Sequence, residues 1–236
     1  MIKAIIGFDL QPGKSMAAYK RNFSNWRAPA ILGNRVAPCG LSLMYAVKQA
    51  VPPGHPAPTP MAYQGLTLNW FESSEQLAAY ADTPLFDTLA KHGLEWLSGT
   101  HGYMVDEVVH WQAPQTTQPG KPAQGFKMIV RASRKAGVSK ADFEKHYREV
   151  HAPLARKHHP AMIGYVQNFV RMPLMTESPD IDVITEMHFH DRADFKKHFY
   201  LNEKSAAITS ADIALFMDLD SVQCLTVEEV IYKTPA

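Results

Sequence analysis

The spacing of apolar residues switches between strand-like and helical patterns, and the same succession occurs twice along the chain. Each half begins with a strand, a helix and two further strands, and ends with a helical stretch and a last strand. In the first half we expect strands near 1–8, 40–45, 64–71 and 103–111 and helical stretches near 15–30 and 74–96. In the second half the strands are 126–131, 164–169, 183–189 and 223–233, and the helical stretches are 139–154 and 192–217.

A constant offset of 124 residues relates the two halves and indicates an internal duplication. Ala28-Pro29 and Ala152-Pro153 keep this offset. Ser15 and Ser139 stand where helix N-caps are expected. The apolar face of the first helix is Tyr19, Phe23, Trp26 and Ala30 in one half and Phe143, Tyr147, Val150 and Leu154 in the other.

The segment 112–124 is rich in proline and glutamine, lacks periodic apolar residues, and is predicted to be a linker. It separates a diverged module, 1–111, from a second module, 125–236. The element order of each module, βαββαβ, is that of a ferredoxin-like unit, an antiparallel sheet with both helices on one face. We therefore expect an α+β protein in which two ferredoxin-like modules pack sheet to sheet as a dimeric α/β barrel within one chain.

Composition narrows the functional classes without choosing one. The chain of 236 residues is 46 % hydrophobic and 20 % charged, with a net charge of +1, so it has no electrostatic bias toward nucleic acid or a membrane surface. No apolar run is long enough to span a bilayer, and the start of the chain does not look like a signal peptide. The two cysteines form no zinc or disulfide pattern. We expect a cytoplasmic protein with a small-molecule substrate, able to form a homodimer through its outer edges.

The second half carries a motif that resembles a known family. The run 138–155, VSKADFEKHYREVHAPLA, followed by Gly164-Tyr165-Val166-Gln167-Asn168 and by Glu186-Met187-His188-Phe189, is similar to the EthD family over about residues 126–233. The first half keeps the architecture while its motif is eroded. The resemblance implies the dimeric α/β-barrel fold, which the duplication predicts independently.

The resemblance leaves the reaction open. EthD-like proteins and their barrel relatives include cofactor-independent lactone isomerases, anthrone decarboxylases and dehydratases, quinone-forming oxygenases and accessory proteins of degradation pathways. A fold does not choose among these activities, so the choice has to come from the site. No P-loop, dinucleotide-binding fingerprint or nucleophile elbow occurs in the appropriate context.

Strand alternation predicts a polar inner face in the second half. We expect Glu186, His188 and His190 to face the barrel interior with Arg131, and the second strand to add Tyr165, Gln167 and Phe169 there. A register shift of one residue would turn any of these side chains to the opposite face. The first half replaces most of them by apolar residues, including Leu68 for Glu186 and Trp70 for His188. Because buried polar groups are costly unless satisfied, this contrast predicts one ligand-binding cavity rather than two.

His151 is the leading candidate for proton transfer. It follows Tyr147 by four residues, near the end of the first helix, and Arg27 occupies its place in the first half. It also matches the histidine of the family's His-Ala-Pro motif. An imidazole whose ordinary pKa is about 6.5 can take or give a proton near neutral pH.

A metal site is an alternative, because Glu186, His188 and His190 share one strand face and offer a carboxylate and two imidazoles. The EthD resemblance implies no metal. Haem occurs in duplicated barrels of this superfamily, and histidine spacing gives no indication of it here. His92, His101 and His110 have no partner that the sequence identifies.

Our first hypothesis is a cofactor-independent lyase, dehydratase or isomerase acting on a small aromatic or lactone-like compound. His151 would move a proton, and His188, held by Glu186, would assist. Arg131 and Arg27 would hold an anionic oxygen, and Tyr165, Gln167 and Trp70 would shape the cavity. The alternatives are an oxygenase acting on a quinol-like substrate, cofactor-free or dependent on metal or haem, and a non-catalytic binding protein of a catabolic or biosynthetic pathway.

Overall fold

The computed structural model describes residues 1–54, 57–112 and 118–235. The strands are β1 (Ile2–Leu10), β2 (Gly40–Ala46), β3 (Gly65–Phe71), β4 (Leu97–Gln112), β5 (Lys121–Pro122), β6 (Phe126–Ala132), β7 (Met162–Pro173), β8 (Val183–Phe189) and β9 (Gln223–Lys233). The α-helices are α1 (Met16–Asn22), α2 (Ala28–Leu32), α3 (Ser74–Ala81), α4 (Pro84–Trp96), α5 (Lys140–His146), α6 (Ala152–His158), α7 (Arg192–His198) and α8 (Glu203–Phe216). Two π-helical turns, η1 (Phe23–Arg27) and η2 (Tyr147–His151), and one 3₁₀ turn, η3 (Leu219–Ser221), complete the structure.

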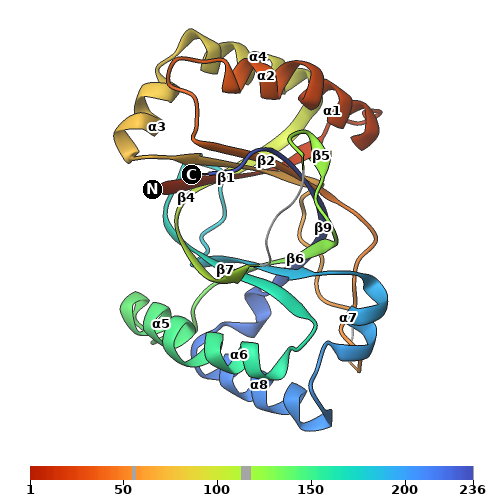
Figure 1. The fold of residues 1–236 in the computed structure, drawn as a ribbon. Helices are drawn as coiled ribbons and strands as arrows, with labels where there is room; N and C mark the ends of the chain where they lie inside the picture. The colour runs from red at the N-terminus through yellow and green to blue at the C-terminus, as the bar shows by residue number, and fades with distance from the viewer. Residues whose placement is uncertain (55–56, 113–117, 236) are drawn as a thin grey trace.

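Within the described residues, eight antiparallel strands close into a barrel in the order β2-β3-β1-β4-β7-β8-β6-β9, and β9 pairs back with β2. Helices α1 to α4 cover one side of the barrel, and α5, α6 and α8 cover the opposite side (Figure 1). The same strand order occurs in both halves, β2-β3-β1-β4 and β7-β8-β6-β9. The α+β class and the barrel predicted from the sequence are therefore confirmed.

The halves join edge to edge through the pairs β4–β7 and β2–β9. β4 reaches Gln112, the first residue of the predicted linker, and Lys121–Pro122 forms the short strand β5 against β9. Residues 113–117 of that linker lie outside the described residues.

Local sequence accounts for the helix boundaries. The side chains of Ser15 and Ser139 accept hydrogen bonds from the backbone N–H of Ala18 and Asp142, so both predicted N-caps are confirmed. The helical stretch 74–96 divides before Pro84, with Thr83 as the second N-cap. The stretch 192–217 divides in the same way, and a capping box at Asn202 starts α8.

Three apolar clusters fill the molecule. One lies between the second-half sheet and its helices and includes Phe143, Phe169 and Phe216. A second, including Ile5, Ile129 and Leu225, fills the barrel, and a third, including Phe8 and Phe23, lies under the first-half helices. The sheet thus has two buried faces, one toward the barrel interior and one toward the helices.

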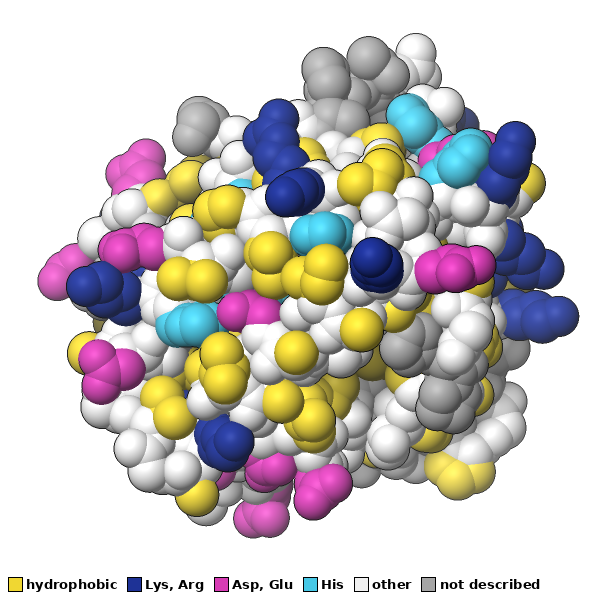
Figure 2. Space-filling view, turned by 90° about the horizontal axis from the view of Figure 1, so that it is seen from below, with side chains coloured by type: hydrophobic (Ala, Val, Ile, Leu, Met, Phe, Trp, Pro, Cys, Tyr) yellow, Lys and Arg dark blue, Asp and Glu magenta, His cyan; other side chains and the backbone are white. Residues whose placement is uncertain are grey.

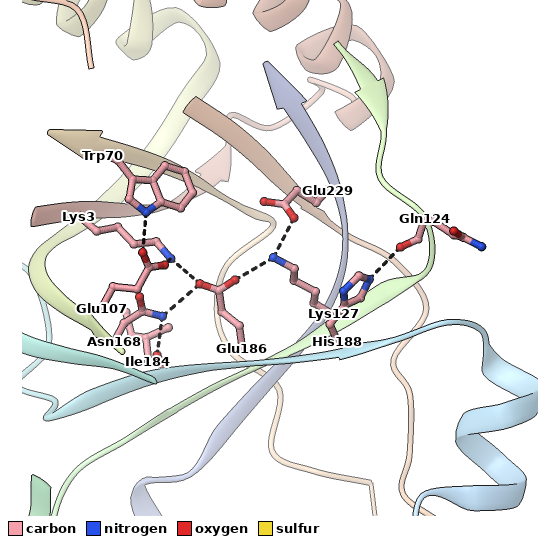
Figure 3. Close-up of polar contacts among 10 residues, drawn as sticks. All are labelled: Lys3, Trp70, Glu107, Gln124, Lys127, Asn168, Ile184, Glu186, His188 and Glu229. Carbon is pink, nitrogen blue, oxygen red and sulfur yellow. Dashed lines mark hydrogen bonds and ion pairs between the residues drawn. The ribbon is translucent and has the colours of Figure 1, made fainter. Parts of the chain in front are cut away.

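A buried ion network crosses the barrel interior and ties the halves together (Figure 3). Lys3 Nζ of the first half lies 2.9 Å from Glu107 Oε1 and 2.5 Å from Glu186 Oε1 of the second half. Lys127 Nζ lies 2.9 Å from Glu186 Oε2 and 2.8 Å from Glu229 Oε2. Burial alone would raise the pKa of Glu186, but Lys127 and Lys3 together hold it well below its usual range.

Removing one member of this network is expected to destabilise the fold. Lys3→Met takes one cation from the buried Glu186 and the only ion-pair partner among the described residues from the partly buried Glu107, and should lower the free energy of unfolding by about 3–5 kcal/mol in urea denaturation. Lys91→Met, at an exposed position of α4, is the control and should change it by less than about 0.5 kcal/mol. Equal stability of the two variants would contradict a structural role for the network.

Candidate functional site

The polar residues predicted for the barrel interior form hydrogen bonds and ion pairs with other side chains there. Besides its two lysines, Glu186 accepts a hydrogen bond from Asn168 Nδ2 at 3.1 Å. Trp70 Nε1 donates to Glu107 Oε2 at 2.9 Å. Arg131 faces the same interior but is engaged elsewhere, with Nη1 at 2.7 Å from Tyr63 Oη and Nη2 at 2.6 Å from Gln223 Oε1.

His188 is not held by Glu186, contrary to the sequence-based hypothesis. Its Nε2 lies 2.8 Å from the backbone oxygen of Gln124, and Lys127 lies between it and Glu186 (Figure 3). Its Nδ1 is buried without a partner among the described residues. Burial lowers the pKa of His188, so this imidazole favours its neutral form.

The interior around Glu186 does not form the predicted ligand cavity in the described part of the chain. The space at Glu186 is lined by Ile5, Met44, Leu66, Leu68, Ile129 and Ile184 and is too small to admit a water molecule. Glu186 is paired in the ion network and Arg131 bonds Tyr63 and Gln223, whereas His188 Nδ1 has no partner among the described residues. The inference from buried polarity to a ligand cavity was wrong at this place.

The metal alternative does not fit these residues. Both oxygens of Glu186 are occupied by lysine ammonium groups, and His190 is exposed beyond the end of β8. Among the described residues no group of three His, Cys, Asp or Glu side chains could hold a metal ion. Two lysines on the carboxylate would oppose a cation electrostatically.

A second polar cluster lies on the other face of the sheet, between β7 and the helices. It centres on His151, whose Nδ1 lies 2.8 Å from Asp212 Oδ2 of α8. The other oxygen of Asp212 is 2.9 Å from His146 Nε2. We call this group the His151 cluster, and it comprises His110, His146, Tyr147, His151, Tyr165, Gln167 and Asp212.

Tyr165 and Gln167 belong to this cluster, which corrects their predicted position in the barrel interior. Tyr165 packs in the helix-side core, and Gln167 Nε2 donates to the backbone oxygen of Tyr147 at 3.0 Å. Phe169 faces the helices as well. The neighbouring Asn168 faces inward instead. The predicted faces of β6 and β8 are correct, so within the second half the error is a shift of one residue in β7.

A π-helical turn places His151. The backbone N–H of Ala152 donates to Tyr147 O, five residues earlier, and Pro153 follows directly. Proline cannot donate a helical hydrogen bond and crowds the carbonyl four residues before it, so a wider turn relieves this conflict. The turn leaves Tyr147 and His151 both buried beneath α8. The first half has the same turn, with Ala28 N–H donating to Phe23 O.

His110 completes the cluster from the first half of the chain. It sits at an irregularity in the β4–β7 pairing, between Val109 and Trp111, where a bulge re-aims a side chain. Its Nε2 lies 2.9 Å from Gln167 Oε1, and its ring centroid is 5.6 Å from that of Tyr165. Sequence reasoning found no partner for His110, because neither the bulge nor the cross-half pairing shows in the local pattern.

The geometry fixes the tautomer of His151. A carboxylate only accepts hydrogen bonds, so Nδ1 carries the proton and Nε2 keeps a lone pair. The bond to Asp212 is the only hydrogen bond of His151 with the described residues. Burial lowers the pKa of His151 although Asp212 opposes the shift, so the ring is neutral at pH 7. A buried imidazole with a free Nε2 is arranged to accept a proton.

The tyrosines next to His151 remain protonated. Burial raises the pKa of Tyr147 and raises that of Tyr165 well above its usual value. Tyr147 Oη lies 2.8 Å from Thr185 Oγ1, and Gln167 Nε2 approaches Tyr165 Oη at 3.4 Å. Phenol groups of this kind donate hydrogen bonds to an oxygen that gains charge.

Comparison with known protein families decides the assignment of this region. Residues 135–220 match the EthD domain. The match confirms the family resemblance and covers 86 of the 236 residues, all of them in the second half. Every member of the His151 cluster except His110 lies within the EthD domain.

Solved structures with the same fold extend over the whole chain. An anthrone oxidase-like protein is 8 % identical, with a TM-score of 0.63 and coverage of 100 % of this chain and 94 % of its own. A candidate monooxygenase from Lactobacillus acidophilus NCFM is 10 % identical, with a TM-score of 0.55 and coverage of 98 % and 96 %. One from Fusobacterium nucleatum subsp. nucleatum ATCC 25586 is also 10 % identical, with a TM-score of 0.53 and coverage of 98 % and 92 %. No curated protein matches the sequence.

The structure separates the sequence-predicted candidates into three places. His151, Tyr165 and Gln167 meet in the His151 cluster, whereas Glu186, His188, Trp70 and Arg131 lie across the sheet in the barrel. Arg27 lies under the first-half helices, where its Nη1 donates to Leu89 O at 3.0 Å. Asp212 was missed, because apolar and polar residues are spread around α8 without a distinct apolar stripe, so the sequence pattern does not show which side of the helix is buried.

On the side of the molecule shown in Figure 2, acidic and basic side chains are interspersed over the EthD domain. This surface is therefore neither predominantly positive nor predominantly negative. Among the described residues, no helix has the length and apolar character needed to cross a membrane.

The Asp212 contact should be visible in the titration of His151. By NMR we expect a pKa below about 6.5 for His151 in the wild type, and a still lower one in Asp212→Asn, because Asp212 favours the imidazolium. Asp194→Asn is the matched control, since Asp194 holds His198 at the same 2.8 Å on the surface. A His151 pKa above 6.5, or one unchanged in Asp212→Asn, would refute the proposed geometry.

Proposed function

We propose that this protein is an enzyme that moves a proton on a small aromatic or lactone-like substrate, with His151 as the general base. The observation that carries the proposal is the buried His151 bonded to Asp212, with no hydrogen-bond partner for its Nε2 among the described residues. Asp212 orients the ring and stabilises the imidazolium that forms when the base accepts a proton. The chemistry assigned to these residues needs no cofactor.

The neighbouring residues supply the rest of the reaction. The substrate's C–H bond would break toward His151 Nε2 and leave an enolate or phenolate, whose oxygen the Tyr165 hydroxyl would stabilise. Return of the proton to another atom gives an isomerisation, and loss of a β-hydroxyl as water, protonated by the imidazolium, gives a dehydration. Gln167, fixed by His110 and by Tyr147 O, would keep Tyr165 in position.

The proposal leaves Glu186, His188, Trp70 and Arg131 without a catalytic role, since they lie on the opposite face of the sheet from His151. It likewise excludes Arg27 from this site.

We further propose that the barrel consists of two duplicated ferredoxin-like modules, 1–111 and 125–236. The shared strand order and the π turns at the same position of each half support this.

An oxygen-using reaction is the second candidate, favoured by the descriptions of the structural neighbours as an anthrone oxidase-like protein and as candidate monooxygenases. The first step would be the same deprotonation. In the case of anthrone, the resulting anion would reduce O₂, and anthrone plus O₂ would give anthraquinone plus water. The two candidates differ in whether oxygen is consumed.

Deuterium exchange tests the proton-transfer step without knowledge of the full reaction. Anaerobic incubation of anthrone in D₂O should show protein-dependent exchange at the acidic methylene carbon, followed by NMR. His151→Ala should lower this rate by about 10²–10⁴-fold. His151→Gln, which retains a donor for Asp212 but lacks a base, should behave like His151→Ala. His198→Ala should exchange as the wild type does, and full exchange in both His151 variants would overturn the assignment.

The pH dependence of the exchange rate follows from the neutral state of His151. The base acts only when unprotonated, so the rate should be level at neutral pH and fall as the pH drops through a midpoint below about 6.5. Asp212→Asn should shift this midpoint to lower pH. A midpoint above 7 in the wild type would identify another base.

Admitting oxygen distinguishes the two candidates. If the protein is an oxygenase, anthraquinone should form with one equivalent of O₂ consumed, measured with an oxygen electrode, and His151→Ala should abolish the increase over the uncatalysed rate. Exchange without oxygen consumption favours the lyase or isomerase reading. Binding without either would favour the non-catalytic alternative.

A further inference from the structure

The first half keeps a polar cluster at the place that corresponds to the His151 cluster. The offset of 124 aligns Asn22 with His146 and Arg27 with His151, and each pair ends the same α or π segment. Aligning the C-caps Leu97 and Met217 places His92 opposite Asp212. The contacts agree, since Asn22 Nδ2 lies 3.4 Å from His92 Nε2 where His146 meets Asp212.

Arg27 differs from His151 in charge and in lacking an acidic partner. It is partly buried between η1 and α4, and its only hydrogen bond with the described residues is the one from Nη1 to Leu89 O. No carboxylate among them lies within ion-pair distance. The guanidinium lies beside Gly93, where an added Cβ would be 4.0 Å from Nη1, an ordinary van der Waals contact. Most of the N–H groups of the Arg27 guanidinium are therefore left without an acceptor among the described residues.

Two polar atoms beside Arg27 also lack partners. His92 Nδ1 and Asn22 Oδ1 are buried without a hydrogen bond in the described part of the chain. The amide Nδ2 of Asn22 can only donate, so His92 Nε2 accepts and Nδ1 carries an unused N–H. Burial and the charge of Arg27 lower the pKa of His92, which keeps the ring neutral. Arg27 and His92 thus offer two sets of free donors.

We propose that Arg27, His92 and Asn22 form a second binding site, in the first half, for the carboxylate of a small aromatic acid. A carboxylate would supply the missing counter-charge to Arg27, in a charge-assisted and geometrically specific contact, and would accept from His92 Nδ1. Asn22 Oδ1 would accept from a hydroxyl group of the ligand or solvent. The Trp26 indole, 36 % exposed and 4.1 Å from the His92 ring centroid, provides a flat apolar surface for the aromatic ring.

This site is independent of the proposed activity. The first-half and second-half helices lie on opposite sides of the barrel (Figure 1), so a ligand at Arg27 does not reach His151. The same backbone position therefore carries different side chains in the two halves. It holds an imidazole paired with a carboxylate in the EthD domain, and in the first half a guanidinium without an acidic partner among the described residues.

Titration of the full chain with benzoate, followed by NMR of the backbone amides and arginine Nε–H groups, tests the site. We expect saturable shifts that map to η1 and α4, and at least tenfold weaker binding of the neutral analogue benzamide. Arg27→Gln should weaken benzoate binding at least tenfold, while Arg21→Gln, at an exposed position of α1, should leave it unchanged.

His92→Phe gives a second test should Arg27→Gln fail to fold, since it keeps a ring against Trp26 and removes the Nδ1 donor. It should weaken benzoate binding several-fold. Equal affinity for benzamide, shifts that map elsewhere, retention of binding in Arg27→Gln or His92→Phe, or no saturable shift up to the solubility limit of benzoate would each overturn the proposal.

Discussion

Pairing of strands across the two halves is the constraint on which the rest of this structure depends. The β4–β7 and β2–β9 ladders leave no free edge within the eight-stranded barrel and enclose its inner face. Once closed, the interior is too narrow for a ligand at Glu186 and is filled by apolar side chains and a satisfied ion network. On the other face of the sheet, under the helices, β4 of the first half brings His110 to the His151 cluster.

The same closure separates two groups of polar side chains, one inside the barrel and one under the helices. The lysines and glutamates inside are fully paired and hold the halves together, so their polarity is structural. On the helix side, each π turn sets one polar residue beneath the last long helix of its half. That residue is His151, bonded to Asp212, in one half, and in the other it is Arg27, which has no acidic partner among the described residues. The equivalent π turns thus place a different polar residue at the same position in each half.

Much of the fold follows from the sequence, because strand and helix periodicities, two serine caps and a constant offset all indicate the same repeated unit. The sequence also singled out His151, from its place beside the apolar stripe and the family motif, and the structure buries it against Asp212. The face of β7 did not, since residues from Gly164 to Val170 are buried on both sides and Gln167 and Asn168 are both polar. Asp212 and His110 escaped prediction because their roles arise from tertiary contacts, one across helices and the other through a bulge between halves.

The central claim is that His151 stands as a neutral base with its proton on Nδ1 and its lone pair on Nε2. Long-range ¹⁵N–¹H NMR correlation of the imidazole ring at pH 7, with His151→Gln to assign the signals, tests it most directly. The account predicts an unprotonated Nε2 and a protonated Nδ1 bonded to Asp212. A protonated Nε2, in either the other tautomer or an imidazolium, would contradict it.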